Sequence, residues 1–208
     1  MAIGQKFSIG FDLTGSWFVM TDERMPSDKR LRLLVLRAQS GDRMAIDRLL
    51  SEHQHDLFGF LTNMLHNHAD AEDALQVTLL QVVRKLKWLK NPASFRPWLY
   101  QIASRTAWRN MKTQGKHNQL NASAQLEQLA AAPQELPPEE DHLIQQIPQW
   151  LERLSMKGRE AVILHYLKGF TTEQVAEILD IPLGTAKSRI SYSLTCIRKW
   201  IEPLKETT

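Results

Sequence analysis

Apolar residues near the C-terminus recur at helical spacing on both sides of a three-residue break, Asp180–Pro182. Before the break, Val175, Ile178 and Leu179 form one stripe. After it, a stripe with a period near 3.6 residues continues through Leu183, Ala186, Ile190, Leu194, Ile197 and Ile201. Two helices joined by so short a turn must pack at a steep angle, so the pattern predicts a helix-turn-helix.

Local sequence signals support both helix starts. Thr171 and Gln174 have the spacing of a capping box, and Phe170 and Val175 that of a hydrophobic staple. Pro182 suits a first helical turn because the N–H that it lacks has no partner there.

The outward face of the second helix carries short polar and cationic side chains. Such side chains can reach base edges and phosphates from a helix that lies in a major groove. A solvated helical hairpin is the alternative interpretation. The candidate DNA-binding residues of this helix are Thr185, Lys187, Ser188, Arg189, Ser191 and Tyr192.

Charges are unevenly distributed along the chain. No Asp or Glu occurs from Ala74 to Leu126, whereas nine Lys and Arg residues do, interleaved with aromatic residues. Residues 118–141 then contain five acids and no Lys or Arg, with prolines that interrupt a long helix. We therefore expect a tail at 1–28, a helical domain at 29–117, a flexible acidic linker at 118–141 and a second helical domain at 142–208. Domains so joined should move independently.

Basic residues with interleaved aromatic rings suit unpaired nucleic acid, because cations follow the backbone while rings stack on bases. The alternative is that the rings are core residues and the cations form a solvated face. Trp98 and the loop before it are the better candidates for binding, and Trp108 fits either interpretation.

The run HNHADAEDALQ places Asp70, Glu72 and Asp73 at the start of a helix, where the helix dipole favours negative charge. This acidic start could also be a protein-docking surface. A metal-dependent hydrolase built on His66, His68, Asp70 and Asp73 is a third possibility. The run lacks a ligand pattern such as HExxH, and we expect no metal.

The length, composition and net charge of the chain are compatible with several of these interpretations. It has 208 residues, 43% of them hydrophobic, and a formal net charge of +3, which permits a nucleic-acid partner. The single cysteine, Cys196, excludes an internal disulfide and fits the cytoplasm. No apolar run is long enough for a membrane span. The first residues do not form a good signal peptide, so we expect a tail or an over-extended start there.

In this order and spacing, four runs resemble the extracytoplasmic-function group of the sigma-70 family of bacterial RNA polymerase sigma factors. They are AQSGDRMAIDRLLSEHQHDLFGF, HADAEDALQVTLLQVVRKL, SFRPWLYQIASRTAWRNMK and LERLSMKGREAVILHYLKGFTTEQVAEILDIPLGTAKSRI. The resemblance covers about 36–117 and 142–203 and implies only the second and fourth sigma domains. The chain departs from the family pattern at Val77, Arg105 and Tyr192, so the family's base preferences are not carried over.

The resemblance implies a role for each part. Docking on core RNA polymerase would use Asp70, Asp73, Gln76, Val77 and Leu80. Recognition and melting of the minus-ten promoter element would use Asn91, Ser94, Phe95, Trp98, Arg105 and Arg109. The helix-turn-helix would read the minus-thirty-five element, and an anti-sigma factor would restrain the protein.

Together these observations predict an all-α protein of two small helical domains that is a promoter-specificity subunit and not an enzyme, with no cofactor. Its partners would be core RNA polymerase, duplex and melted promoter DNA, and an anti-sigma factor. A stand-alone helix-turn-helix regulator is the main alternative, although it leaves the docking helix and the basic aromatic block without a role.

Overall fold

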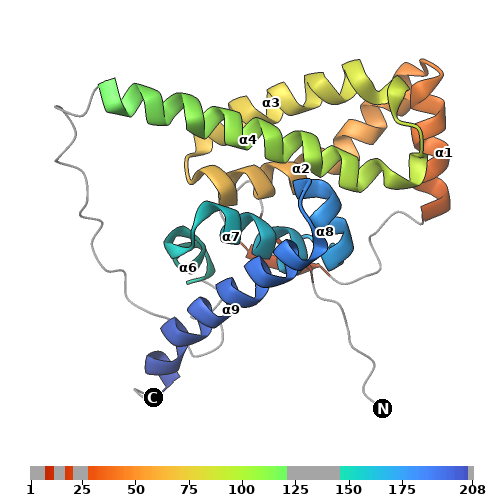
Figure 1. Ribbon diagram of the computed structural model, residues 1–208. Helices are drawn as coiled ribbons and strands as arrows, with labels where there is room; N and C mark the ends of the chain where they lie inside the picture. The colour runs from red at the N-terminus through yellow and green to blue at the C-terminus, as the bar shows by residue number, and fades with distance from the viewer. Residues whose placement is uncertain (1–7, 12–16, 21–27, 121–145, 206–208) are drawn as a thin grey trace, which may run out of the picture.

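Helices form both domains of the chain (Figure 1). The computed structural model describes residues 8–11, 17–20, 28–120 and 146–205. The N-terminal domain comprises α1 (Asp28–Gln39), α2 (Arg43–Leu65), α3 (His68–Lys85), the 3₁₀ turns η2 (Leu86–Trp88) and η3 (Pro92–Ser94), and α4 (Phe95–Leu120). The C-terminal domain comprises α6 (Ile147–Arg153), α7 (Met156–Val162), the π-helical turn η4 (Ile163–Leu167), α8 (Thr172–Leu179) and α9 (Leu183–Lys205). The predicted class, two helical domains, is confirmed.

Side-chain caps define where several helices begin. Asp42, Asn67, Ser155 and Thr171 each precede a helix, and each accepts a hydrogen bond from a first-turn backbone N–H. These caps satisfy donors that have no partner within the helix. Short polar residues before apolar stripes therefore set the element boundaries.

The N-terminal segment, which we expected to be a tail, contains two short strands. Strands β1 (Ser8–Phe11) and β2 (Trp17–Met20) pair antiparallel, with Ser8 opposite Met20 and Phe11 opposite Trp17. Aromatic and β-branched residues on either side of a Gly-containing stretch are typical of such a hairpin. The interpretation of residues 1–28 as a tail did not anticipate this hairpin, which lies outside the two helical domains.

The predicted linker, 118–141, lies outside the described residues except at the end of α4. Its flexibility and the domain boundaries on either side of it remain predictions.

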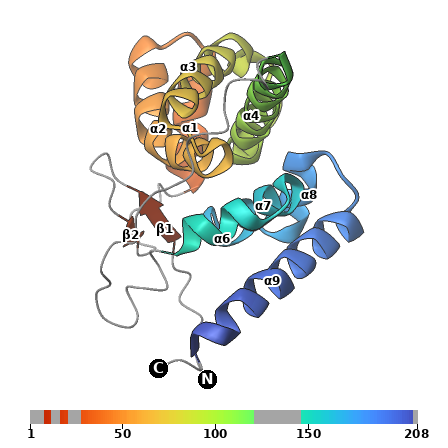
Figure 2. The ribbon, with the colours of Figure 1, turned by 90° about the vertical axis from the view of Figure 1, so that its left-hand side faces the viewer.

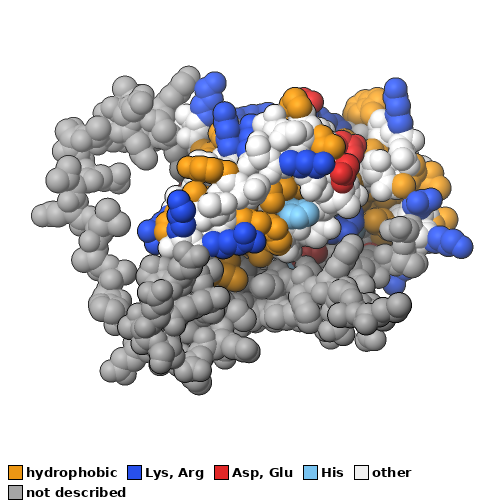
Figure 3. All heavy atoms as spheres, turned by 60° about the horizontal axis from the view of Figure 1, so that its bottom comes forward, with side chains coloured by type: hydrophobic (Ala, Val, Ile, Leu, Met, Phe, Trp, Pro, Cys, Tyr) orange, Lys and Arg blue, Asp and Glu red, His pale blue; other side chains and the backbone are white. Residues whose placement is uncertain are grey.

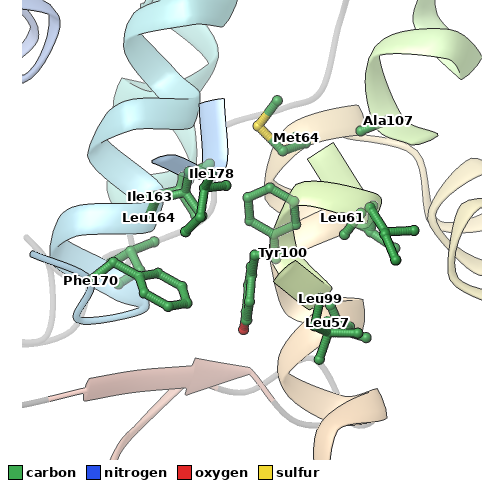
Figure 4. Packing of buried hydrophobic residues seen from close by; sticks show 14 of the residues in the cluster. Leu57, Leu61, Met64, Leu99, Tyr100, Ala107, Ile163, Leu164, Phe170 and Ile178 are labelled. Atoms are coloured by element: carbon green, nitrogen blue, oxygen red, sulfur yellow. The ribbon is translucent and has the colours of Figure 1, made fainter. Parts of the chain in front are cut away.

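The two domains share one hydrophobic core (Figure 4). The ring of Tyr100, on α4, lies 5.3 Å from that of Phe60 in its own domain and 5.0 Å from that of Phe170 in the other. Leu57 and Leu61 lie on one side of this contact, and Ile163, Leu164 and Ile178 on the other. Independent motion, as expected from the linker, would therefore require this interface to open.

Figure 2 shows the domains as two layers, with α8 beside α4 and with α9 extending away from the N-terminal domain. This packing leaves the outer face of α3 and much of α9 exposed to solvent.

Candidate DNA and polymerase interfaces

The helix-turn-helix forms as the apolar pattern predicts. Thr171 and Gln174 make both hydrogen bonds of a capping box, which fixes the start of α8. Asp180 ends α8 in the left-handed conformation, with φ of 55°, and Asp is one of the few residues that tolerate it. Ala186 and Ile190 are buried, so α9 packs on the C-terminal domain through its apolar stripe.

The opposite face of α9 presents most of the predicted DNA-binding side chains to solvent. Lys187, Ser188, Ser191 and Tyr192 are exposed, and Tyr192 has 72% of its surface accessible. Thr185 is half-buried, and its carbonyl accepts a hydrogen bond from Ser188 Oγ at 3.0 Å. The exposed set extends for more than one helical turn and is therefore long enough to follow a groove.

Arg189 differs from the other predicted residues of this helix. It is half-buried. Burial raises the pKa of Glu160, a carboxyl on α7, and the charge of Arg189 opposes this rise. Arg189 therefore interacts electrostatically with a buried carboxylate and is only partly available on the outer face of α9.

The loop before α4 is held together by its own polar groups. Asn91 Oδ1 accepts from the Ala93 N–H at 3.0 Å, and Asn91 Nδ2 donates to Ser94 Oγ at 3.3 Å. Asn91 is exposed and Ser94 is half-buried. The loop is thus a preformed, partly exposed surface in front of α4.

Phe95, predicted as a DNA-binding residue, is a core residue instead. None of its surface is accessible, and its ring lies edge-on to His53 at 5.2 Å. Trp98 is half-buried, 6.0 Å from the Phe95 ring, and it packs against the core. Trp98 can therefore present only part of its ring to a base.

Trp88 is an exposed aromatic residue of the basic stretch that was not among the predicted DNA-binding residues. Its exposed fraction is 64%, and the ammonium of Lys87 lies 4.5 Å from its ring centroid. An exposed ring beside a cation suits an unpaired base. The interleaving of Lys with aromatic residues contained this signal, but only the fold shows which ring is exposed.

The two arginines predicted for the minus-ten region face different surroundings. Both side chains are exposed on α4. Arg105 lies 3.9 Å from Asp180 of the helix-turn-helix. Arg109 lines a groove of about 350 Å³ between α3 and α4, together with Asp70 and Asp73.

The predicted docking face lies along α3. Asp73, Gln76, Val77 and Leu80 are exposed, and the apolar pair Val77 and Leu80 is 41% and 58% accessible. Asp70 is half-buried near the cap made by Asn67. Val83, 43% accessible, extends the same helix surface and was not predicted. We call Asp73, Gln76, Val77 and Leu80 the α3 face.

His66 and His68, near the α3 face, each lie close to a different carboxylate. His66 Nδ1 lies 3.2 Å from Glu152, and His68 Nδ1 lies 3.4 Å from Glu72. In the described ranges, no group of three or more His, Cys, Asp or Glu residues is placed to hold a metal ion. The site that the hydrolase alternative requires is therefore not assembled here.

Figure 3 shows Lys and Arg side chains on both sides of the face that it presents, with hydrophobic side chains between them.

A membrane-crossing helix would need greater length and apolarity than any helix among the described residues has.

Two protein-family descriptions match the chain in the order of its domains. Sigma-70 region 2 matches residues 49–117, and Sigma-70, region 4 matches residues 144–196. The chain belongs to the extracytoplasmic-function group of the sigma-70 family. The first match contains the α3 face and most of α4, and the second contains α8 and the first part of α9.

Several curated sigma factors are similar over most of their length. The sigma-H factor of Pseudomonas aeruginosa is 28% identical over 180 residues, covering 82% of this chain and 93% of the relative. The extracytoplasmic-function sigma-E factor of Haemophilus influenzae is 29% identical, covering 82% and 95%. That of Escherichia coli K12 is also 29% identical, covering 83% and 95%.

Two solved structures have a similar fold. The sigma factor RpoE of Bartonella quintana, solved in complex with the anti-sigma factor NepR, has a TM-score of 0.63 and 26% identity, covering 75% of this chain and 96% of that chain. CnrH, solved with the cytosolic domain of CnrY, has the same TM-score at 18% identity, covering 83% and 97%. This second likeness concerns the fold alone.

Proposed function

We propose that this sigma factor binds core RNA polymerase through the α3 face and directs it to promoters that its two domains read. The loop before α4, with Asn91 and Ser94, and α4 itself, with Trp98, Arg105 and Arg109, meet the minus-ten element. The outer face of α9 meets the minus-thirty-five element. The chain acts as a binding subunit rather than an enzyme, in the cytoplasm, where an anti-sigma factor controls it.

One observation supports this proposal most strongly: a single chain carries regions 2 and 4 in order, with an exposed apolar and acidic face on α3. Exposed apolar side chains beside carboxylates suit a protein partner, because burial supplies affinity and charge supplies specificity. A stand-alone DNA-binding regulator would have no use for this face.

The decisive experiment is transcription in vitro with core RNA polymerase and genomic DNA, followed by mapping of the start sites. We expect start sites that require this protein and that share upstream elements. Duplex binding without co-purification of polymerase would instead favour the stand-alone regulator.

Lys187 is exposed on the outer face of α9 and suits a phosphate contact. We therefore expect Lys187→Ala to weaken duplex binding to a similar degree on all sequences. The salt dependence of log K should become shallower by about one unit, because one fewer counterion is released. Fluorescence anisotropy on duplexes taken from the mapped promoters, at several salt concentrations, measures both effects.

Ser188→Ala is the matched control, because Ser188 lies next in the helix and carries no charge. It should alter sequence preference and leave the salt dependence unchanged. A loss for Lys187→Ala of about 1–3 kcal/mol confined to one base position would indicate a guanine contact and contradict the phosphate assignment.

A further inference from the structure

An exposed tryptophan lies at the turn that joins α3 to α4. Trp88 is the last residue of η2, and 64% of its surface is accessible. The other tryptophans whose burial the structure describes are half-buried or buried. Burial of an indole ring would stabilise the fold, yet water covers this one. A ligand could therefore gain affinity by covering the Trp88 ring.

The backbone on both sides of Trp88 is held by α1. Gln39 Nε2 donates to the Leu86 carbonyl at 2.9 Å and to the Leu89 carbonyl at 2.7 Å. The Leu86 side chain is buried, and that of Leu89 packs against the core. Figure 1 shows this turn beside α1, at one end of the N-terminal domain. Because the turn is anchored, a ligand that binds the ring has less chain entropy to overcome.

Cations surround the ring. The Lys87 ammonium lies 4.5 Å from the ring centroid, within the range of a cation–π interaction. Arg84, Lys85 and Lys90 are exposed on either side. The sequence has no Asp or Glu from Ala74 to Leu126, and within the described ranges none of these four cations forms an ion pair. The turn therefore presents uncompensated positive charge around an accessible aromatic face.

This arrangement is complementary to an unpaired nucleotide, because a base can stack on the ring while phosphates contact the cations. We propose that Trp88 and Lys87 form a stacking site for one unpaired base of the melted promoter strand, with phosphate contacts from Arg84, Lys85 and Lys90. The site is a property of this turn. Only the promoter, as the source of the single strand, rests on the proposed function.

The position of the ring predicts which base it captures. Asn91, in the loop before α4, follows Trp88 by three residues, so their Cα atoms are at most about 11 Å apart. That distance corresponds to about three stacked nucleotides at about 3.4 Å each. The stacked base therefore lies within about three nucleotides of the base that the loop meets. Trp88 lengthens the contacted single strand beyond the reach of Trp98, which is half-buried.

A protein partner is the competing occupant, since tryptophan is also common at protein interfaces. Such interfaces bury their aromatic residues in a centre from which lysine is depleted. Here Lys87 lies on the ring itself, and Lys85 and Lys90 flank it in the sequence. The cations around the ring thus favour a polyanion over an apolar protein surface.

Binding of single-stranded DNA to the full-length protein tests the site. The probe is a fluorescein-labelled strand of about 12 mixed A and T nucleotides, followed by anisotropy. We expect Trp88→Ala to weaken binding by about 5- to 140-fold, the loss of one stacked base, and Trp88→Phe to weaken it less. Val83→Ala is the matched control, because Val83 is apolar and 43% accessible near the end of the same helix. It should leave the affinity unchanged.

A double-mutant cycle separates stacking from a structural effect. One abasic position is moved along the strand, and at one position the wild-type protein should lose as much affinity as Trp88→Ala loses on the intact strand. At that position Trp88→Ala should show no further loss, because the stacked pair is already gone. Lys87→Gln should lower the salt slope on single strands by about 0.7. This second variant keeps the test valid if circular dichroism shows that Trp88→Ala does not fold.

The outcomes distinguish this site from the proposed function. No binding of the single strand by the wild type, or equal affinities of wild type and folded Trp88→Ala, would overturn the stacking site. If Trp88→Ala instead weakens only the binding of core polymerase, the ring belongs to a protein interface and the proposal is also overturned. If core polymerase does not bind at all, the proposed function fails, and the single-strand cycle alone still decides the site.

Permanganate reactivity of melted thymines, measured with core polymerase on the mapped promoters, shows whether the site acts in initiation. Trp88→Ala should reduce the fraction of opened promoters and leave closed-promoter binding unchanged, because the ring meets only an unpaired base. Normal opening by the folded variant would contradict a role for Trp88 on the melted strand.

Discussion

Arg159→Ala should lower the free energy of unfolding by about 3–5 kcal/mol, since it removes several charged hydrogen bonds at once. Arg159 is 8% exposed and lies at the C-terminal ends of two helices. It donates to the carbonyls of Leu151 at 2.7 Å and Glu152 at 2.8 Å near the end of α6, and of Met64 at 3.2 Å near the end of α2. Carbonyls in the last turn of a helix lack the usual donor four residues ahead and favour a cation.

Urea unfolding followed by circular dichroism measures this loss. Arg159→Lys keeps the charge but cannot reach all the carbonyls from one ammonium, so its loss should be intermediate. Arg153→Ala is the matched control: Arg153 is exposed and lies over the Trp200 ring at 4.5 Å, a contact worth about 0.5–1 kcal/mol. Equal losses for Arg159→Ala and Arg153→Ala would contradict the capping role.

Asp73→Arg should reduce the affinity for core polymerase by about 10- to 100-fold, because charge reversal turns attraction into repulsion at the proposed interface. Asp73 is exposed and lines the groove between α3 and α4, so the change affects the α3 face without disturbing the core. Binding of labelled protein to core polymerase measures the effect, and duplex binding by α9 should remain as in the wild type.

Glu72→Arg makes the same charge change one residue earlier. Glu72 is exposed and pairs with His68 at 3.4 Å, outside the groove lining. We expect Glu72→Arg to reduce the affinity for core polymerase less than Asp73→Arg does at the same ionic strength. If the wild type and a folded Asp73→Arg variant bind core polymerase with similar affinity, the assignment of α3 as the docking helix is contradicted.

Features set by neighbouring residues could be predicted from the sequence. The capping box of Thr171 and Gln174, the short turn ending at Pro182 and the stripe of α9 all involve residues within a few positions of one another. The acidic start of α3 likewise lies within one helical turn, where the helix dipole favours negative charge. Local hydrogen bonds and a repeating apolar face are properties of a short segment, so its pattern determines them.

Tertiary packing decided which aromatic residues are accessible. Phe95 and Trp88 stand in the same basic aromatic stretch, yet Phe95 is buried against His53 of α2 while Trp88 remains exposed. Composition cannot separate them, because exposure depends on which helix covers each ring.

The interface between the domains is the clearest case of information absent from the local pattern. Glu160 reads as an ordinary polar residue on a short helix, but in the structure it receives hydrogen bonds from residues 52 and 56 positions away. The sequence by itself determined the helices, their caps and the polar face of α9, because those depend on neighbours along the chain. Only the tertiary structure decided that Glu160 is buried, that Phe95 is core and that the two readers touch, because desolvation depends on which distant segments pack together.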